Sequence, residues 1–139
     1  MKVTFPESVP DAKLKFAVIV ARSGGKWVFC KHRERDTYEC PGGHREPGED
    51  VETTARRELW EETGAEKFSL RRIGPYVVDD EGTVTCGMFY FAEIEKFGQL
   101  PEMEIERVEL MKTLPEAWSY PQIQPHLINR VREMEIVSY

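Results

Sequence analysis

The chain has 139 residues, of which 25 are Asp or Glu and 19 are Lys or Arg, so its net charge is −6. This length predicts a single domain, residues 1–139, with a core large enough to fold without disulfides. The acidic balance argues against stable nucleic acid binding, and it would repel a polyphosphate unless a divalent cation accompanied it.

The first twelve residues, with Pro6 and Pro10, predict an irregular or edge segment. They lack the apolar core of a signal peptide, and the longest apolar run, residues 16–21, is too short to span a bilayer. We therefore expect a cytoplasmic protein without membrane contact. The three cysteines show no C-x-x-C spacing, so we expect buried thiols and neither disulfides nor a zinc site.

Two strands are expected next, at residues 14–21 and 26–32, joined by a turn at residues 22–25 into a hairpin. The charged segment 33–37 follows as a loop. It could present Arg33 and Arg35 to phosphates, although a solvated basic loop is the preferred interpretation.

Residues 38–40 are typical of a short extended piece that leads into a turn at residues 41–43. The glycines there allow positive φ and close backbone approach. A helix follows residue 49 and ends at Gly64, the residue type best suited to a left-handed C-cap.

The second half begins with strands at residues 69–78 and 83–94, joined by a turn at residues 79–82. We interpret the aromatic residues between 87 and 92 as core. A strand at residues 104–111 is predicted to place four residues on one face, which are Glu104, Glu106, Val108 and Leu110. An amphipathic helix at residues 123–134 tolerates Pro125 because it lies in the first turn. This order of elements indicates an α/β fold with a mixed sheet between helices.

Acidic residues lie on or beside the apolar stripe of the first helix. At about 100° per residue, Val51, Ala55 and Leu59 share that stripe. Glu62 projects into it, with Glu58 at its edge and Glu61 further round. Ionised groups in such positions are costly unless they are paired or bind a metal, so the pattern indicates a cation site.

The segment from Gly43 to Ala65 has the fixed spacing G-x5-E-x7-R-E-U-x-E-E-x-G-U, where U is apolar. Its fixed positions are Gly43, Glu49, Arg57, Glu58, Glu61, Glu62 and Gly64. This pattern resembles the signature of the Nudix hydrolases at every fixed position. The resemblance implies an α/β/α sandwich in which the signature forms a loop-helix-loop.

The resemblance also implies roles for the signature residues. Glu58, Glu61, Glu62 and the carbonyl of Gly43 would hold Mg²⁺, with Mn²⁺ as a substitute. Glu58 or Glu61 would serve as general base, and Arg57 would orient a signature glutamate. As an extra metal ligand from the later strand we name Glu104, with Glu106 as the second choice.

The implied reaction is hydrolysis of a nucleoside diphosphate linked to another moiety, most simply a nucleoside triphosphate cut to monophosphate and pyrophosphate. The patterns of the ADP-ribose, diadenosine polyphosphate and coenzyme A subgroups are not matched. The segments 24–27 and 38–43 are similar to bacterial nucleoside triphosphatases that act on oxidised guanine nucleotides. Two alternatives stay open: removal of pyrophosphate from RNA 5′ ends, and a non-catalytic nucleotide sensor. The expected partner is a small nucleotide, and the chain is expected to be a monomer or homodimer.

Overall fold

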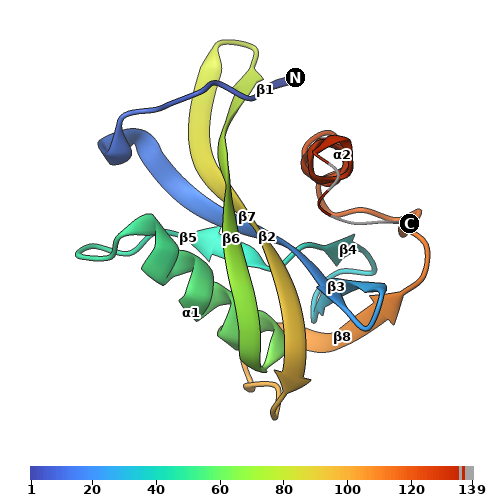
Figure 1. Cartoon of the computed structure of the whole chain (residues 1–139). Coiled ribbons are helices and arrows are strands. Elements are labelled where there is room, and N and C mark those ends of the chain that lie inside the picture. The colour runs from blue at the N-terminus through green and yellow to red at the C-terminus, as the bar shows by residue number, and fades with distance from the viewer. Residues whose placement is uncertain (135, 137–139) are drawn as a thin grey trace.

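The computed structural model describes residues 1–134 and residue 136. It has two α-helices, one short 3-10 helix (η1, Asp11–Lys13) and one mixed sheet (Figure 1). The strands are β1 (Lys2–Thr4), β2 (Leu14–Ser23), β3 (Lys26–His32), β4 (Tyr38–Glu39), β5 (Gly42–His44), β6 (Ala65–Asp80), β7 (Thr83–Phe97) and β8 (Ile105–Met111). The helices are α1 (Val51–Thr63) and α2 (Gln124–Glu133).

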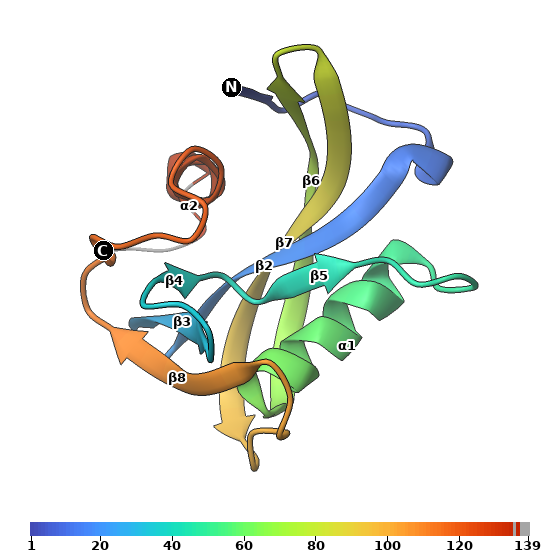
Figure 2. The ribbon, with the colours of Figure 1, turned by 180° about the vertical axis from the view of Figure 1, so that it is seen from behind.

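The sheet runs in the order β1-β6-β7-β2-β3-β4, with β5 paired to β2 and β8 paired to β3. Only the β2 and β7 pair is parallel among the described strands. One edge of β2 pairs first with β5 and then with β3. The chain therefore leaves the sheet edge at β5 and enters α1 directly beside the middle of the sheet, as Figure 2 shows.

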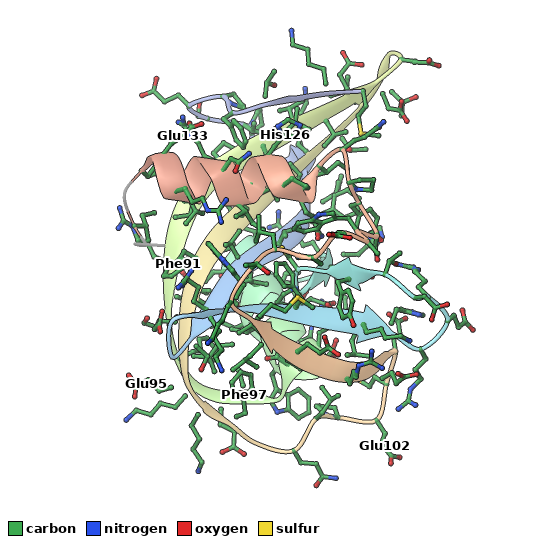
Figure 3. All side chains as sticks on the ribbon, turned by 90° about the vertical axis from the view of Figure 1, so that its right-hand side faces the viewer. Phe91, Glu95, Phe97, Glu102, His126 and Glu133 are labelled. Carbon is green, nitrogen blue, oxygen red and sulfur yellow. The ribbon has the colours of Figure 1, made fainter. Side chains whose placement is uncertain are left out.

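The helices cover opposite faces of the sheet. Alternate residues of β2 divide between two cores, with Ile19 packed in the cluster that includes Leu59 of α1, and Val20 in the cluster that includes Leu127 of α2. Figure 3 shows α2 lying across the strands, with His126 and Glu133 on its outer side and Phe91 beneath it. The α/β/α sandwich with a mixed sheet is therefore confirmed.

Most elements lie where the sequence predicted them. The hairpin of β2 and β3 turns at Gly24 and Gly25, which both have positive φ. Strands β6 and β7 are longer than expected because β6 begins immediately after Gly64 and their pairing extends from Ala65 and Phe97 to the turn. The three cysteines are buried free thiols, as predicted.

Two local predictions are wrong. The expected turn at residues 41–43 is instead strand β5, and neither Gly42 nor Gly43 has a positive φ. In β8, the pairing with β3 shifts between Ile105 and Arg107, so the side chains do not alternate regularly. Because of this shift, the four residues predicted to share one face do not all lie on it, and Ile105, which is not one of the four, is the buried residue at the start of the strand.

Neither helix within residues 1–134 and 136 has the length and apolar character needed to cross a membrane.

Candidate active site

Helix α1 is fixed at both ends by local interactions. The side chain of Asp50 accepts a hydrogen bond from the backbone N–H of Thr53 at 2.7 Å, an N-cap that is typically worth about 1 kcal/mol. At the other end, Gly64 has φ 74° and donates its N–H to the carbonyl of Trp60 at 2.8 Å. The caps fix where the helix begins and ends, and the buried stripe of Val51, Ala55 and Leu59 sets the direction of each glutamate.

Glu62 is the buried carboxylate of this helix, with only 8% of the residue exposed. Its Oε1 accepts the N–H of Gly42 at 2.9 Å. Burial raises the pKa of Glu62 to about 8, and repulsion from Glu58, Glu39 and Glu104 adds to the effect, while the Gly42 hydrogen bond opposes it. Glu62 thus occupies the inward position that the helical periodicity predicted.

Glu58 lies against the backbone of β5. A Cβ built on Gly43 would stand 2.6 Å from the carboxylate carbon of Glu58, so any larger residue would displace this side chain. Burial raises the pKa of Glu58, Arg57 lowers it in part, and Glu61 and Glu104 raise it further. Close approach, and not positive φ, is therefore the reason for a glycine at position 43.

Arg57 connects the carboxylates of the loop and the helix. Its Nε and Nη2 donate to the two oxygens of Glu49 at 2.7 and 3.0 Å, and its Nη1 donates to Glu58 at 2.8 Å and to Glu61 at 3.2 Å. These bonds from Arg57 are the main reason that the pKa of Glu49 falls to about 2. Arg57 therefore holds the loop and two helix carboxylates in one arrangement.

Two cavities adjoin at this end of the sheet. The smaller, about 310 Å³, is lined by Glu46, Arg57, Glu58, Glu61, Glu62, Met103, Glu104 and Ile105. The larger, about 430 Å³, has mixed polar and apolar walls. Glu62 and Glu104 line both cavities, so a ligand with a charged part and an uncharged part could extend from one into the other.

The carboxylates of the smaller cavity fit a divalent cation by charge and by atom type. Five glutamates line it, and Arg57 is its one basic lining residue in the described part of the chain. Oxygen ligands of this kind suit Mg²⁺. In residues 1–134 and 136, however, no three acidic, His or Cys side chains already converge on one point, because Glu58 and Glu61 turn toward Arg57 and Glu62 toward Gly42. These carboxylates would have to turn to bind an ion.

The two candidate ligands of the later strand have different surroundings. Glu104 precedes β8, lines both cavities, and has its Oε2 3.9 Å from Nε2 of His32. Glu106 instead pairs with Lys31 at 3.4 Å and with Arg107 at 2.7 Å, and it lines neither cavity. The geometry therefore favours Glu104 as the carboxylate near the site.

Sequence reasoning missed the residues that shape the larger cavity. These include His32, Glu39, Tyr120 and Gln124. Arg35 lines it as well, although its Nη1 donates to Glu39 at 3.0 Å, whereas Arg33 donates through Nε to the carbonyl of Met103 at the surface. No spacing rule connects positions so far apart, and only the folded sheet brings them together.

The sequence matches the NUDIX domain family over residues 12–130, which is most of the chain. This chain belongs to the Nudix family. The enzyme class predicted from the signature, a Nudix pyrophosphohydrolase, is confirmed, and Nudix hydrolases in general use divalent metal ions.

Relatives of known sequence include the Bacillus subtilis protein named "Putative 8-oxo-dGTP diphosphatase YtkD". It is 42% identical over 117 residues, which cover 84% of this Nudix chain and 73% of YtkD. A "MutT-like protein" of Streptomyces ambofaciens is 39% identical over 57 residues, covering 41% of this chain and 37% of that protein.

Solved Nudix structures superpose over most of this chain. The crystal structure of the Bacillus subtilis pyrophosphohydrolase BsRppH has a TM-score of 0.82 at 30% identity, and covers 99% of this chain and 92% of BsRppH. The NUDIX domain of Shewanella oneidensis NrtR, in complex with ADP ribose, has a TM-score of 0.68 at 18% identity over 92% of this chain and 94% of that chain. The likeness to NrtR, at 18% identity, shows the shared fold.

Proposed function

We propose that this Nudix protein hydrolyses nucleoside triphosphates, including oxidised guanine nucleotides, to the monophosphate and pyrophosphate with Mg²⁺. The observation that carries the proposal is the pair of adjoining cavities that share Glu62 and Glu104. The acidic cavity suits a metal-bound polyphosphate, and the mixed cavity suits a nucleoside. The name of YtkD supports the triphosphate substrate, since that relative is 42% identical.

In this proposal, Glu58, Glu62 and the carbonyl of Gly43 hold a divalent ion, and Glu61 and Glu104 complete the acidic set. A bound Mg²⁺ would neutralise phosphate oxygens and activate a water. Glu58 or Glu61 accepts the proton of the attacking water. Arg57 is a positioning residue, because it contacts both of these carboxylates and Glu49.

The test is a panel of canonical and oxidised nucleoside triphosphates incubated with the purified chain, with and without Mg²⁺ and with Mn²⁺ as a substitute. The products are separated by ion-exchange chromatography. We expect nucleoside monophosphate and pyrophosphate only when a divalent ion is present. Release of inorganic phosphate and nucleoside diphosphate, or no metal-dependent hydrolysis of any nucleotide, would refute this reaction.

A second candidate function is removal of pyrophosphate from RNA 5′ ends. The likeness to BsRppH over 99% of this chain favours it, because the name of that protein is pyrophosphohydrolase and its fold is similar throughout. The net charge of −6 opposes it, since an RNA path needs basic surface. Adding 5′-triphosphorylated RNA to the same panel separates the two, because the preferred substrate has the larger kcat/KM.

We infer that residues 1–139 act as one domain and need no nucleic acid or membrane partner. The chain is expected to work as a monomer or homodimer in the cytoplasm, which sedimentation and cell fractionation would test.

A further inference from the structure

We propose that Gln124 determines base preference, and that it selects purines with an oxygen at position 6 over those with an amino group there. This inference rests on the proposed nucleotide substrate and adds the residue that distinguishes one base from another. It concerns the larger cavity, which Gln124 lines together with Glu62 of the signature.

Gln124 is held rigidly at the start of α2. The residue is 5% exposed, and its backbone N–H bonds to the carbonyl of Tyr120 at 3.1 Å. Its side-chain Oε1 accepts the N–H of Cys40 at 2.7 Å. A backbone N–H can only donate, so this bond fixes which end of the amide is oxygen and which is nitrogen.

The nitrogen of the same amide is left to the cavity. Gln124 lines the larger cavity, and no protein acceptor within residues 1–134 and 136 bonds to its Nε2. In the same part of the chain, Nε2 of Gln124 is not among the fully buried side-chain polar atoms that lack a hydrogen-bond partner. Nε2 is therefore not sealed in the core, and because Gln124 lines the larger cavity, its two hydrogens are available to a ligand bound there.

A glutamine with its oxygen already engaged cannot recognise adenine in the usual way. That mode needs both ends of the amide, with the oxygen accepting from the adenine amino group and the nitrogen donating to N7. Here only donors remain, so an amino group at position 6 would meet another donor. An oxygen at position 6, as in guanine, hypoxanthine or 8-oxoguanine, accepts from Nε2 directly.

Glu39 supplies a matching acceptor in the same cavity. Its Oε1 accepts from Arg35 and from the Oγ of Ser119 at 2.9 Å, while Oε2 has no hydrogen bond to the described residues. A 6-oxo purine carries an N–H at position 1, next to its oxygen. This N–H can donate a hydrogen bond to a carboxylate. Adenine has a lone pair at that position, which a carboxylate repels. Apolar walls at Val18, Tyr76 and Ile123 suit the ring faces.

The test compares wild type with Gln124→Glu and Gln124→Met. The glutamate keeps an oxygen for the Cys40 N–H but replaces the donor with an acceptor. The methionine has neither. Gln122→Glu is the matched control, since Gln122 is exposed, two residues away, and does not line the cavity. For each protein, kcat/KM is measured with GTP, ITP and ATP, and binding of GMP and AMP is measured by calorimetry without metal.

We expect wild type and Gln122→Glu to prefer GTP and ITP over ATP. Gln124→Glu should lower the ratio of GTP to ATP by about tenfold or more, mainly through KM, and Gln124→Met should lower it by a smaller factor. Ratios within about twofold of wild type in both Gln124 variants would overturn the inference. If wild type hydrolyses no nucleotide, the proposed function fails, and a GMP to AMP binding ratio that the Gln124 variants leave unchanged would overturn this inference separately.

Discussion

The carboxylate of Glu58 packs directly on the backbone of Gly43, at a distance that leaves no room for a Cβ atom. The two residues are fifteen positions apart, and they meet because β5 pairs with β2 and α1 packs on the face of the sheet beside that pair. The signature glycine and the signature glutamate thus form one structural unit.

Gly43→Ala tests this unit. The new methyl group would push the Glu58 carboxylate aside while leaving the backbone unstrained, because φ of Gly43 is not positive. We expect hydrolysis to fall by about tenfold or more, with a change in Tm of only a few degrees. Gly74→Ala is the control, because nothing lies within 4 Å of a Cβ at that position. Equal activity of the two variants would contradict the proposed role of Gly43.

Replacing the other helix carboxylates tests whether they act in hydrolysis without being needed for folding. Glu61→Gln and Glu62→Gln should each lower kcat by orders of magnitude, because each removes a negative charge from the cavity proposed to hold the ion. Circular dichroism should show an intact fold. Glu52→Gln is the matched control, since Glu52 lies on the same helix, is exposed, and forms its ion pair with Arg56 at the surface. Near-wild-type rates in both site variants would show that the roles are wrongly assigned.

Arg57→Lys tests whether geometry or charge matters at this position. Lysine retains the charge but cannot donate two parallel bonds to Glu49 while reaching Glu58. We expect a loss of about 1.5–3 kcal/mol in the free energy of unfolding and a clear fall in kcat. Arg56→Lys should change neither, since Arg56 is about half exposed in its pair with Glu52. Urea denaturation and steady-state kinetics provide the two readouts.

The raised pKa of Glu62 makes the stability of the metal-free protein depend on pH. Because the folded-state pKa is about 8 and the ordinary value is 4.5, the folded state binds the proton more tightly. The contribution of protonated Glu62 to the free energy of unfolding is complete below pH 4.5 and is lost as pH rises through about 8. We expect the free energy of unfolding of wild type, relative to Glu62→Gln, to fall by on the order of 2–4 kcal/mol between pH 5 and 8. A constant difference across that range would show that Glu62 is not desolvated as described.

Much of the fold follows from local patterns. The apolar run at residues 27–30 and the capped stripe of α1 depend on neighbours in sequence, and the inward direction of Glu62 follows from helical periodicity alone. β5 was missed because two glycines in succession indicate a turn, whereas here they allow close packing on β2 and Glu58. The irregular pairing of β8 depends on its partner β3, which no local pattern reveals.

The candidate site also has a part that the sequence predicts and a part that only the folded chain reveals. Its acidic half lies within one helix and the loop before it, so spacing was enough to name the residues. The half that includes His32, Glu39 and Gln124 comes from three separate segments that meet only in the folded chain. The sequence points to Glu104 from its position at a strand end, and in the structure Glu104 lines both cavities, while its role as a metal ligand stays a prediction.

The proposed metal site is tested most directly by a crystal structure of the protein with Mn²⁺ and a non-hydrolysable nucleoside triphosphate, in which anomalous scattering locates the metal. We expect a Mn²⁺ ion bound by Glu58 and Glu62, in contact with the phosphates, and the base beside Gln124. A structure in which the nucleotide is bound but both carboxylates point apart into solvent, with no ion between them, would contradict it.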